Sequence, residues 1–141
     1  MSKSSLLALA LVFPIVVLGI WTARIDYKIK KAPEITIRAE GYDPRNLISG
    51  HYLNLRLNWQ ETDCSQFSDN LCHPSRFKSI YNYYLPEYAA QELDRIILKE
   101  KLAIDLVFAY PKNKQPHLKR LLINGQKWKK WLKKRNKKAA E

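Results

Sequence analysis

The chain has 141 residues, which is enough for one folded domain and no more. Charged residues make up 27% of it and hydrophobic residues 46%, a balance that excludes an intrinsically disordered protein. The net charge of +12 is unevenly distributed. Residues 127–141 carry eight positive charges and one negative charge, hence +7, whereas residues 1–126 carry 17 positive and 12 negative charges, hence +5.

The N-terminal segment contains an uncharged run over residues 4–23. Twenty helical residues span about 30 Å, the thickness of the hydrocarbon core of a bilayer, and a membrane helix tolerates an internal proline such as Pro14. We therefore expect residues 1–27 to form an uncleaved membrane anchor and residues 28–33 to form a juxtamembrane linker. A cleaved signal peptide and a buried soluble helix are the alternatives, although residues 18–23 offer no good cleavage site.

Residues 34–126 are expected to form a small α+β domain with a mainly antiparallel sheet and one amphipathic helix. In HYLNLRLNW, leucines and a tryptophan recur at every second position, which is typical of a half-buried strand. In PEYAAQELDRIILKEK, Ala89, Leu93, Ile96 and Ile97 share one side at helical spacing. The expected strands are 34–39, 51–59, 79–85, 103–110 and 118–123, the last followed by an Asn-Gly turn.

Two cysteines, Cys64 and Cys72, lie eight positions apart in a loop rich in turn-forming residues. Their spacing favours a local disulfide, which persists only in an oxidising compartment. A metal site that adds His73 as a third ligand is the less favoured interpretation. The basic residues after the apolar run outnumber Lys3 and would by themselves place the domain in the cytoplasm, so the two signals conflict.

The stretch DPRNLISGHYLNLRL, residues 43–57, resembles the signature of the GDYXXLXY family of small membrane-anchored bacterial proteins. Three positions match that signature: Gly50, Tyr52 and Leu55. Two positions depart from it, because His51 replaces the family's aspartate and Leu57 replaces its final tyrosine. Downstream, YYLPEYAAQELDRI, AIDLVFAY and LKRLLINGQKW resemble the later blocks of the family, so that the resemblance extends over about residues 34–128.

The resemblance implies an N-terminal anchor in the bacterial inner membrane, a domain on the periplasmic side (N-in, C-out) and no established biochemical activity. The motif residues are expected to have a structural or partner-binding role. They are Asp43, Pro44, Arg45, Gly50, His51, Tyr52 and Leu55. Because His51 replaces a carboxylate, an ion pair between that position and Arg45 is lost or inverted.

No catalytic residue, metal or cofactor is expected. The three histidines, His51, His73 and His117, have no metal-ligand spacing between them. Ser49 lies beside a turn glycine, but no lysine in a second matching block accompanies it, so a membrane-tethered hydrolase is only an alternative. The carboxylates at the start of the expected helix are interpreted as stabilising its positive dipole end.

The C-terminal segment KWKKWLKKRNKK has Trp128, Trp131 and Leu132 on one side if it is helical. This pattern is typical of an interfacial helix, and we expect contact with an anionic membrane surface. The expected contact residues are Lys127, Trp128, Lys130, Trp131 and Lys134. The alternatives are a solubilising end with Trp128 packed on the domain, and binding of nucleic acid.

The sequence thus predicts a non-enzymatic, membrane-anchored extracytoplasmic domain. Its expected partners are the membrane and an integral membrane protein or an envelope component. A domain that faces the cytoplasm and binds nucleic acid through its basic end is the less favoured alternative, because it requires the opposite topology.

Overall fold

The computed structural model describes residues 3–41, 52–67, 75–111 and 115–140. The chain divides into two compact units, Met1–Pro33 and Glu34–Glu141. The basic segment therefore belongs to the same unit as the sheet. The boundary expected between residues 126 and 127 lies inside this second unit, and the helix that follows it packs on the domain core.

The first unit is a single helix, α1 (Lys3–Lys31), with Pro14 inside it. Within this helix, residues 8–31 are long and apolar enough to cross a membrane by length and composition. The Thr22 hydroxyl donates to the carbonyl oxygens of Leu18 and Gly19 at 2.9 and 3.0 Å, so that this polar group is satisfied inside the helix. Residues 28–31 of the expected linker continue the helix, so that only residues 32 and 33 of it lie outside α1.

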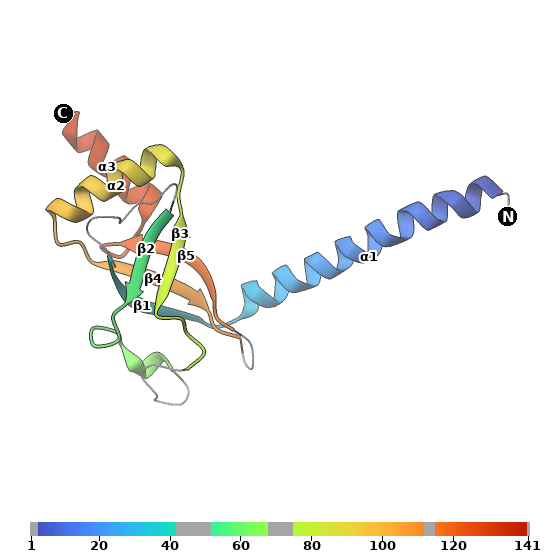
Figure 1. Cartoon of the computed structure of the whole chain (residues 1–141), viewed down its shortest axis with the longest axis horizontal. Coiled ribbons are helices and arrows are strands. Elements are labelled where there is room, and N and C mark those ends of the chain that lie inside the picture. Colours follow the sequence, from blue (N-terminus) through green and yellow to red (C-terminus); the bar gives the residue numbers. More distant parts are fainter. Residues whose placement is uncertain (1–2, 42–51, 68–74, 112–114, 141) are drawn as a thin grey trace. The chain divides into compact units, whose positions relative to one another are not determined.

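The second unit is built on an antiparallel sheet that curves strongly around its inner face (Figure 1). Six strands are found among the described residues, in the spatial order β3-β2-β1-β4-β5-β6. Their bounds are β1 (Glu34–Gly41), β2 (Tyr52–Leu57), β3 (Ile80–Tyr84), β4 (Ile104–Ala109), β5 (His117–Ile123) and β6 (Gln126–Lys127). The other elements are a 3-10 turn, η1 (Cys64–Gln66), and the helices α2 (Glu87–Lys99) and α3 (Trp128–Ala139). The predicted α+β fold is confirmed.

The inner face of the sheet carries the core because apolar residues alternate along its strands. On β2, Leu53, Leu55 and Leu57 are buried as the period-two pattern predicted, while Arg56 between them is exposed. The strand ends earlier than expected, because the side chain of Asn58 accepts the backbone N–H groups of residues 60 and 61 and starts a turn. Helix α2 covers the core with the residues that its spacing indicated: Ala89, Leu93 and Ile96 are buried, and Ile97 is partly buried.

The loop after β2 completes the hydrogen bonding of β1 where β2 has turned away. The side-chain oxygen of Gln66 accepts the backbone N–H of Thr36 at 2.8 Å, and its amide nitrogen donates to the carbonyl of Thr36 at 2.6 Å. Two residues further along β1, the backbone N–H of Arg38 donates to the hydroxyl of Thr62 at 3.1 Å. These contacts satisfy backbone groups that would otherwise lack partners in the middle of the sheet. Sequence patterns did not reveal them.

Candidate functional site

Helix α3 begins directly after a tight turn that reverses the chain from β5 into β6. Asn124 and Gly125 have φ angles of 50° and 76°, which is the backbone that a two-residue hairpin of the Asn-Gly type requires. Lysine, arginine, leucine and alanine have high helix propensity and make up most of the following segment. Lys137 and Lys138 lie in the last turn, where positive charge stabilises the helix dipole.

One side of α3 is part of the domain core. Trp128 and Leu132, one turn apart, are 6% and 5% exposed. Trp131 is partly buried against the same core, and the guanidinium of Arg135 lies 5.5 Å from the centre of its ring. The interpretation in which Trp128 packs on the domain is therefore the one that the structure supports.

The other side of α3 is a continuous lysine surface, which we call the lysine face. At about 100° per residue, its members extend around the half of the helix that does not carry Trp128 and Leu132, and all of them are exposed. Lys129 lies at the edge of this half, and its ammonium is 5.5 Å from the centre of the Trp128 ring. The lysine face consists of Lys129, Lys130, Lys133, Lys134, Lys137 and Lys138. Lys127, just before the helix, is also exposed.

This arrangement divides the expected membrane-contact residues into two groups. Lys130 and Lys134 lie on the lysine face, as exposed charges. Trp128 lies on the opposite side and is buried, so its indole does not take part in a surface contact. The expectation that the apolar stripe itself faces a membrane is corrected, because the sheet and α2 present a core that the stripe completes.

Helices α2 and α3 are joined by a two-pronged ion pair. The guanidinium of Arg135 donates to both carboxylate oxygens of Glu100, at 2.9 and 2.6 Å. These hydrogen bonds, together with the positive charge of Arg135, lower the pKa of Glu100. The pKa of Arg135 is raised by the same hydrogen bonds and by the charges of Glu100 and Glu92. The positive charge of Arg135 is thus neutralised within the domain, whereas the charges of the lysine face have no such partner among the described residues.

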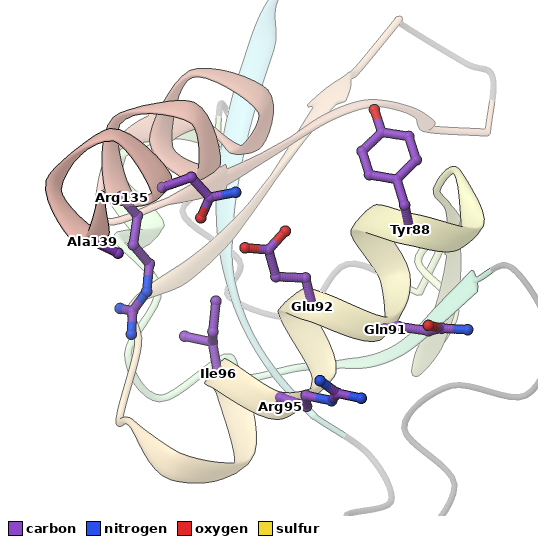
Figure 2. Close-up of a pocket in the computed structure, with 8 residues that line it drawn as sticks. Tyr88, Gln91, Glu92, Arg95, Ile96, Arg135 and Ala139 are labelled. Carbon is purple, nitrogen blue, oxygen red and sulfur yellow. The ribbon is translucent and has the colours of Figure 1, made fainter. Parts of the chain in front are cut away.

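A groove of about 490 Å³ lies between the two helices (Figure 2). Tyr88, which is 68% exposed, lies at one end and Arg135 at the other, and Ile96 lies beside Arg135 as a largely buried apolar side chain (Figure 2). The remaining lining residues are Gln91, Glu92, Arg95, Asn136 and Ala139. The groove thus combines an exposed aromatic ring with charges of both signs, a composition suited to a polar contact with a partner.

Other charged groups of the domain form separate structural pairs on the sheet. Arg38 and Asp105 face each other across β1 and β4 at 2.9 Å. Burial raises the pKa of Asp105, and the charge of Arg38 opposes that increase. A β-bulge in β5 accompanies the approach of two successive cations, Lys119 and Arg120, to the carboxylate of Glu34. Both groups include a residue of β1, Arg38 in one and Glu34 in the other, and no ion pair among the described residues joins them.

Most of the motif residues lie outside the described residues, namely Asp43, Pro44, Arg45, Gly50 and His51. The two that are described lie on β2. Leu55 is completely buried in the core, and Tyr52 is half-buried with its ring centre 5.6 Å from that of Tyr84. Leu55 is thus a core residue, and the structural or partner-binding role of the motif stays a prediction.

Cys64 lies in η1, and its sulfur is 3.3 Å from the carbonyl oxygen of Thr62. Cys72 and His73 lie outside the described residues, so the Cys64–Cys72 disulfide stays a prediction. Within the described parts of the chain, no group of three or more His, Cys, Asp or Glu side chains is placed to hold a metal ion.

The sequence indicated the composition of the lysine face but not its separation from the tryptophans, and it gave no sign of the groove. Both depend on the way in which α3 packs beside α2. Comparison of the chain with protein-family models, curated proteins and solved structures gives no match.

Proposed function

We propose that the protein is a membrane-anchored, non-enzymatic domain of the bacterial envelope, held on the extracytoplasmic side, where it binds an integral membrane protein or an envelope component. The observation that carries this proposal is the division of the chain. An apolar helix over residues 8–31, with a mean hydropathy of 2.1 in an 18-residue window, is followed, after only two residues, by a unit with its own core. A helix of this kind holds the attached domain at the membrane surface.

The extracytoplasmic placement is supported by the cysteine pair and by the resemblance to the GDYXXLXY family. A loop of turn-forming residues between Cys64 and Cys72 would be closed by a disulfide in an oxidising compartment. The basic residues that follow the apolar run favour the opposite orientation. The cysteine pair and the basic residues thus predict opposite orientations of the domain. The side of the membrane on which the C-terminus lies can be measured directly.

Topology is tested by reporters fused after Glu141 in a bacterial host. We expect alkaline phosphatase, which folds only outside the cytoplasm, to be active, and β-galactosidase to be inactive. The matched control carries the same reporters on a chain that starts at Glu34, in which the phosphatase should lose its activity. Active β-galactosidase on the full chain would contradict the proposal and favour the cytoplasm-facing alternative.

The cysteine prediction has its own readout. Non-reducing and reducing gels of alkylated protein should differ in mobility for the full chain, and Cys64→Ser should abolish the difference. Free thiols at both cysteines in protein taken directly from the cell envelope would argue against an oxidising compartment.

A partner is sought at the α2–α3 groove, because concave sites with an exposed tyrosine and arginine are favoured in protein interfaces. A photo-crosslinking amino acid at Tyr88 should give a discrete adduct with an integral membrane protein in intact cells. The control position is Arg56, which is exposed on β2 and is not one of the groove-lining residues. Equal adducts at both positions, or none at Tyr88, would argue against the groove as a partner site.

Hydrolysis of a peptide or ester that Ser49→Ala abolishes would overturn the non-enzymatic part of the proposal.

A further inference from the structure

The lysine face carries more positive charge than the fold uses. Arg135 pairs with Glu100, but no ion pair among the described residues includes any of the six lysines. Lysines at positions 129 and 133, 130 and 134, 133 and 137, and 134 and 138 are like-charge pairs four residues apart, which destabilise a helix. A helix that only covered the core would need Trp128 and Leu132. It would not need six lysines that repel one another.

The elements packed against α3 do not supply carboxylates to these lysines. Glu100 is bound to Arg135, and Glu92 acts on the same guanidinium. The strands beside α3 are β5 and β6, whose sequences HLKRLLI and QK contain no acidic residue. Within the described residues, the lysine face is therefore a uniformly positive surface, and no carboxylate there competes with an external anion through an ion pair.

Only a short segment connects the domain to the proposed anchor. Helix α1 ends at Lys31 and β1 begins at Glu34, so that Ala32 and Pro33 alone connect them. Two extended residues span about 7 Å. If α1 spans a bilayer, the start of β1 lies close to the lipid headgroups.

We propose that the lysine face of α3 binds the anionic phospholipid headgroups of the membrane in which α1 is anchored. This inference rests on the proposed membrane anchor and adds a second contact of defined chemistry. The binding is electrostatic and peripheral, because the apolar residues that an inserting helix would use are already part of the domain core. Its strength falls with ionic strength, since exposed charges are screened by salt.

The test uses the full chain in lipid nanodiscs, of phosphatidylcholine alone or with about 30% phosphatidylglycerol as the anionic lipid. Lysine modification by an amine-reactive reagent is followed residue by residue with mass spectrometry. In anionic discs we expect modification of the lysine face to slow by about threefold or more, and to recover at about 0.5 M salt. The internal controls are the exposed Lys78, Lys99 and Lys101, which should react equally in both discs.

Two variants with the same net charge distinguish binding by the lysine face from a general attraction of the positively charged chain to anionic lipid. K130Q/K133Q/K137Q should remove the protection of Lys129, Lys134 and Lys138. K78Q/K99Q/K101Q should leave that protection unchanged. Both sets of substitutions are at exposed positions, so retained folding is expected and is checked by thermal unfolding.

The opposing outcomes are distinct. A chain that does not enter the discs, judged by co-elution, overturns the membrane anchor and with it this proposal. A chain that enters the discs but shows equal modification in neutral and anionic lipid overturns the lipid contact alone. Protection by an added single-stranded DNA oligomer but not by anionic lipid also overturns it and assigns the face to nucleic acid.

Discussion

The two helices of the domain, α2 and α3, are nearly equal in length but are built from opposite compositions. Helix α2 carries three acidic and two basic side chains, whereas the 12 residues of α3 carry seven basic side chains and no acidic one. Helix α2 buries Ala89, Ala90, Leu93 and Ile96, and α3 buries only Trp128 and Leu132.

This difference in composition suggests that covering the core and presenting positive charge are divided between the two helices. Helix α2 has the balanced surface of an element whose purpose is to cover a core. Helix α3 uses a narrow apolar strip and the Arg135–Glu100 ion pair to attach to the domain, and leaves six lysines outside. The comparison therefore predicts that stability depends on α2 more than on α3, and that charge-dependent binding depends on α3.

The largest loss of stability is expected from Leu93→Ala on α2. Leu93 is completely buried, so the substitution should leave a cavity and lower the free energy of unfolding by about 3 to 4 kcal/mol. Urea unfolding of the full chain in detergent, followed by tryptophan fluorescence, measures the change. The control on the same helix is Arg95→Ala, an exposed position, which should change stability by no more than about 0.5 kcal/mol. Equal effects of the two variants would show that α2 does not cover the core as described.

A smaller loss is expected from Leu132→Ala on α3, about 2 to 3 kcal/mol, because this side chain lies at the periphery of the core. The same unfolding assay applies, with the neighbouring Lys133→Ala as the control. If Leu132→Ala had no effect, α3 would not be part of the folded unit, and its apolar strip would again be available to a membrane.

The smallest effect is expected from Glu100→Gln, which removes the ion pair between the helices. Arg135 lowers the pKa of Glu100 in the folded state, so the pair stabilises the fold above the ordinary pKa of a glutamate. This stabilisation is lost as the pH falls through the folded-state pKa. The difference in thermal midpoint between the wild-type chain and Glu100→Gln should therefore be present at neutral pH and disappear at strongly acidic pH.

The control for this last variant is Glu61→Gln, an exposed glutamate in the loop after β2, which should show a smaller difference at neutral pH. A Glu100→Gln difference that persists unchanged below the pKa of the carboxyl would mean that the loss is due to packing and not to charge.

Local patterns predicted most of the secondary structure because each depends on neighbours along the chain. The period-two leucines of β2, the 3.6-residue period of α2 and the Asn124–Gly125 turn all have such a local cause. The second helix of the domain was not assigned to it, because Trp128, Trp131 and Leu132 fit an interfacial helix as well as a packed one. Only the presence of a core beside them distinguishes the two.

The amino-acid sequence by itself determined the apolar α1, the alternation of the strands and the positive charge of residues 127–141. It did so because hydrophobicity, propensity and charge are properties of the residues and their order. The tertiary structure alone decided which side of α3 is covered, that Arg135 is neutralised by Glu100, and that Gln66 completes the hydrogen bonding of β1. These contacts join residues 30 or more positions apart, and such distances become short only when the sheet and its two helices assemble.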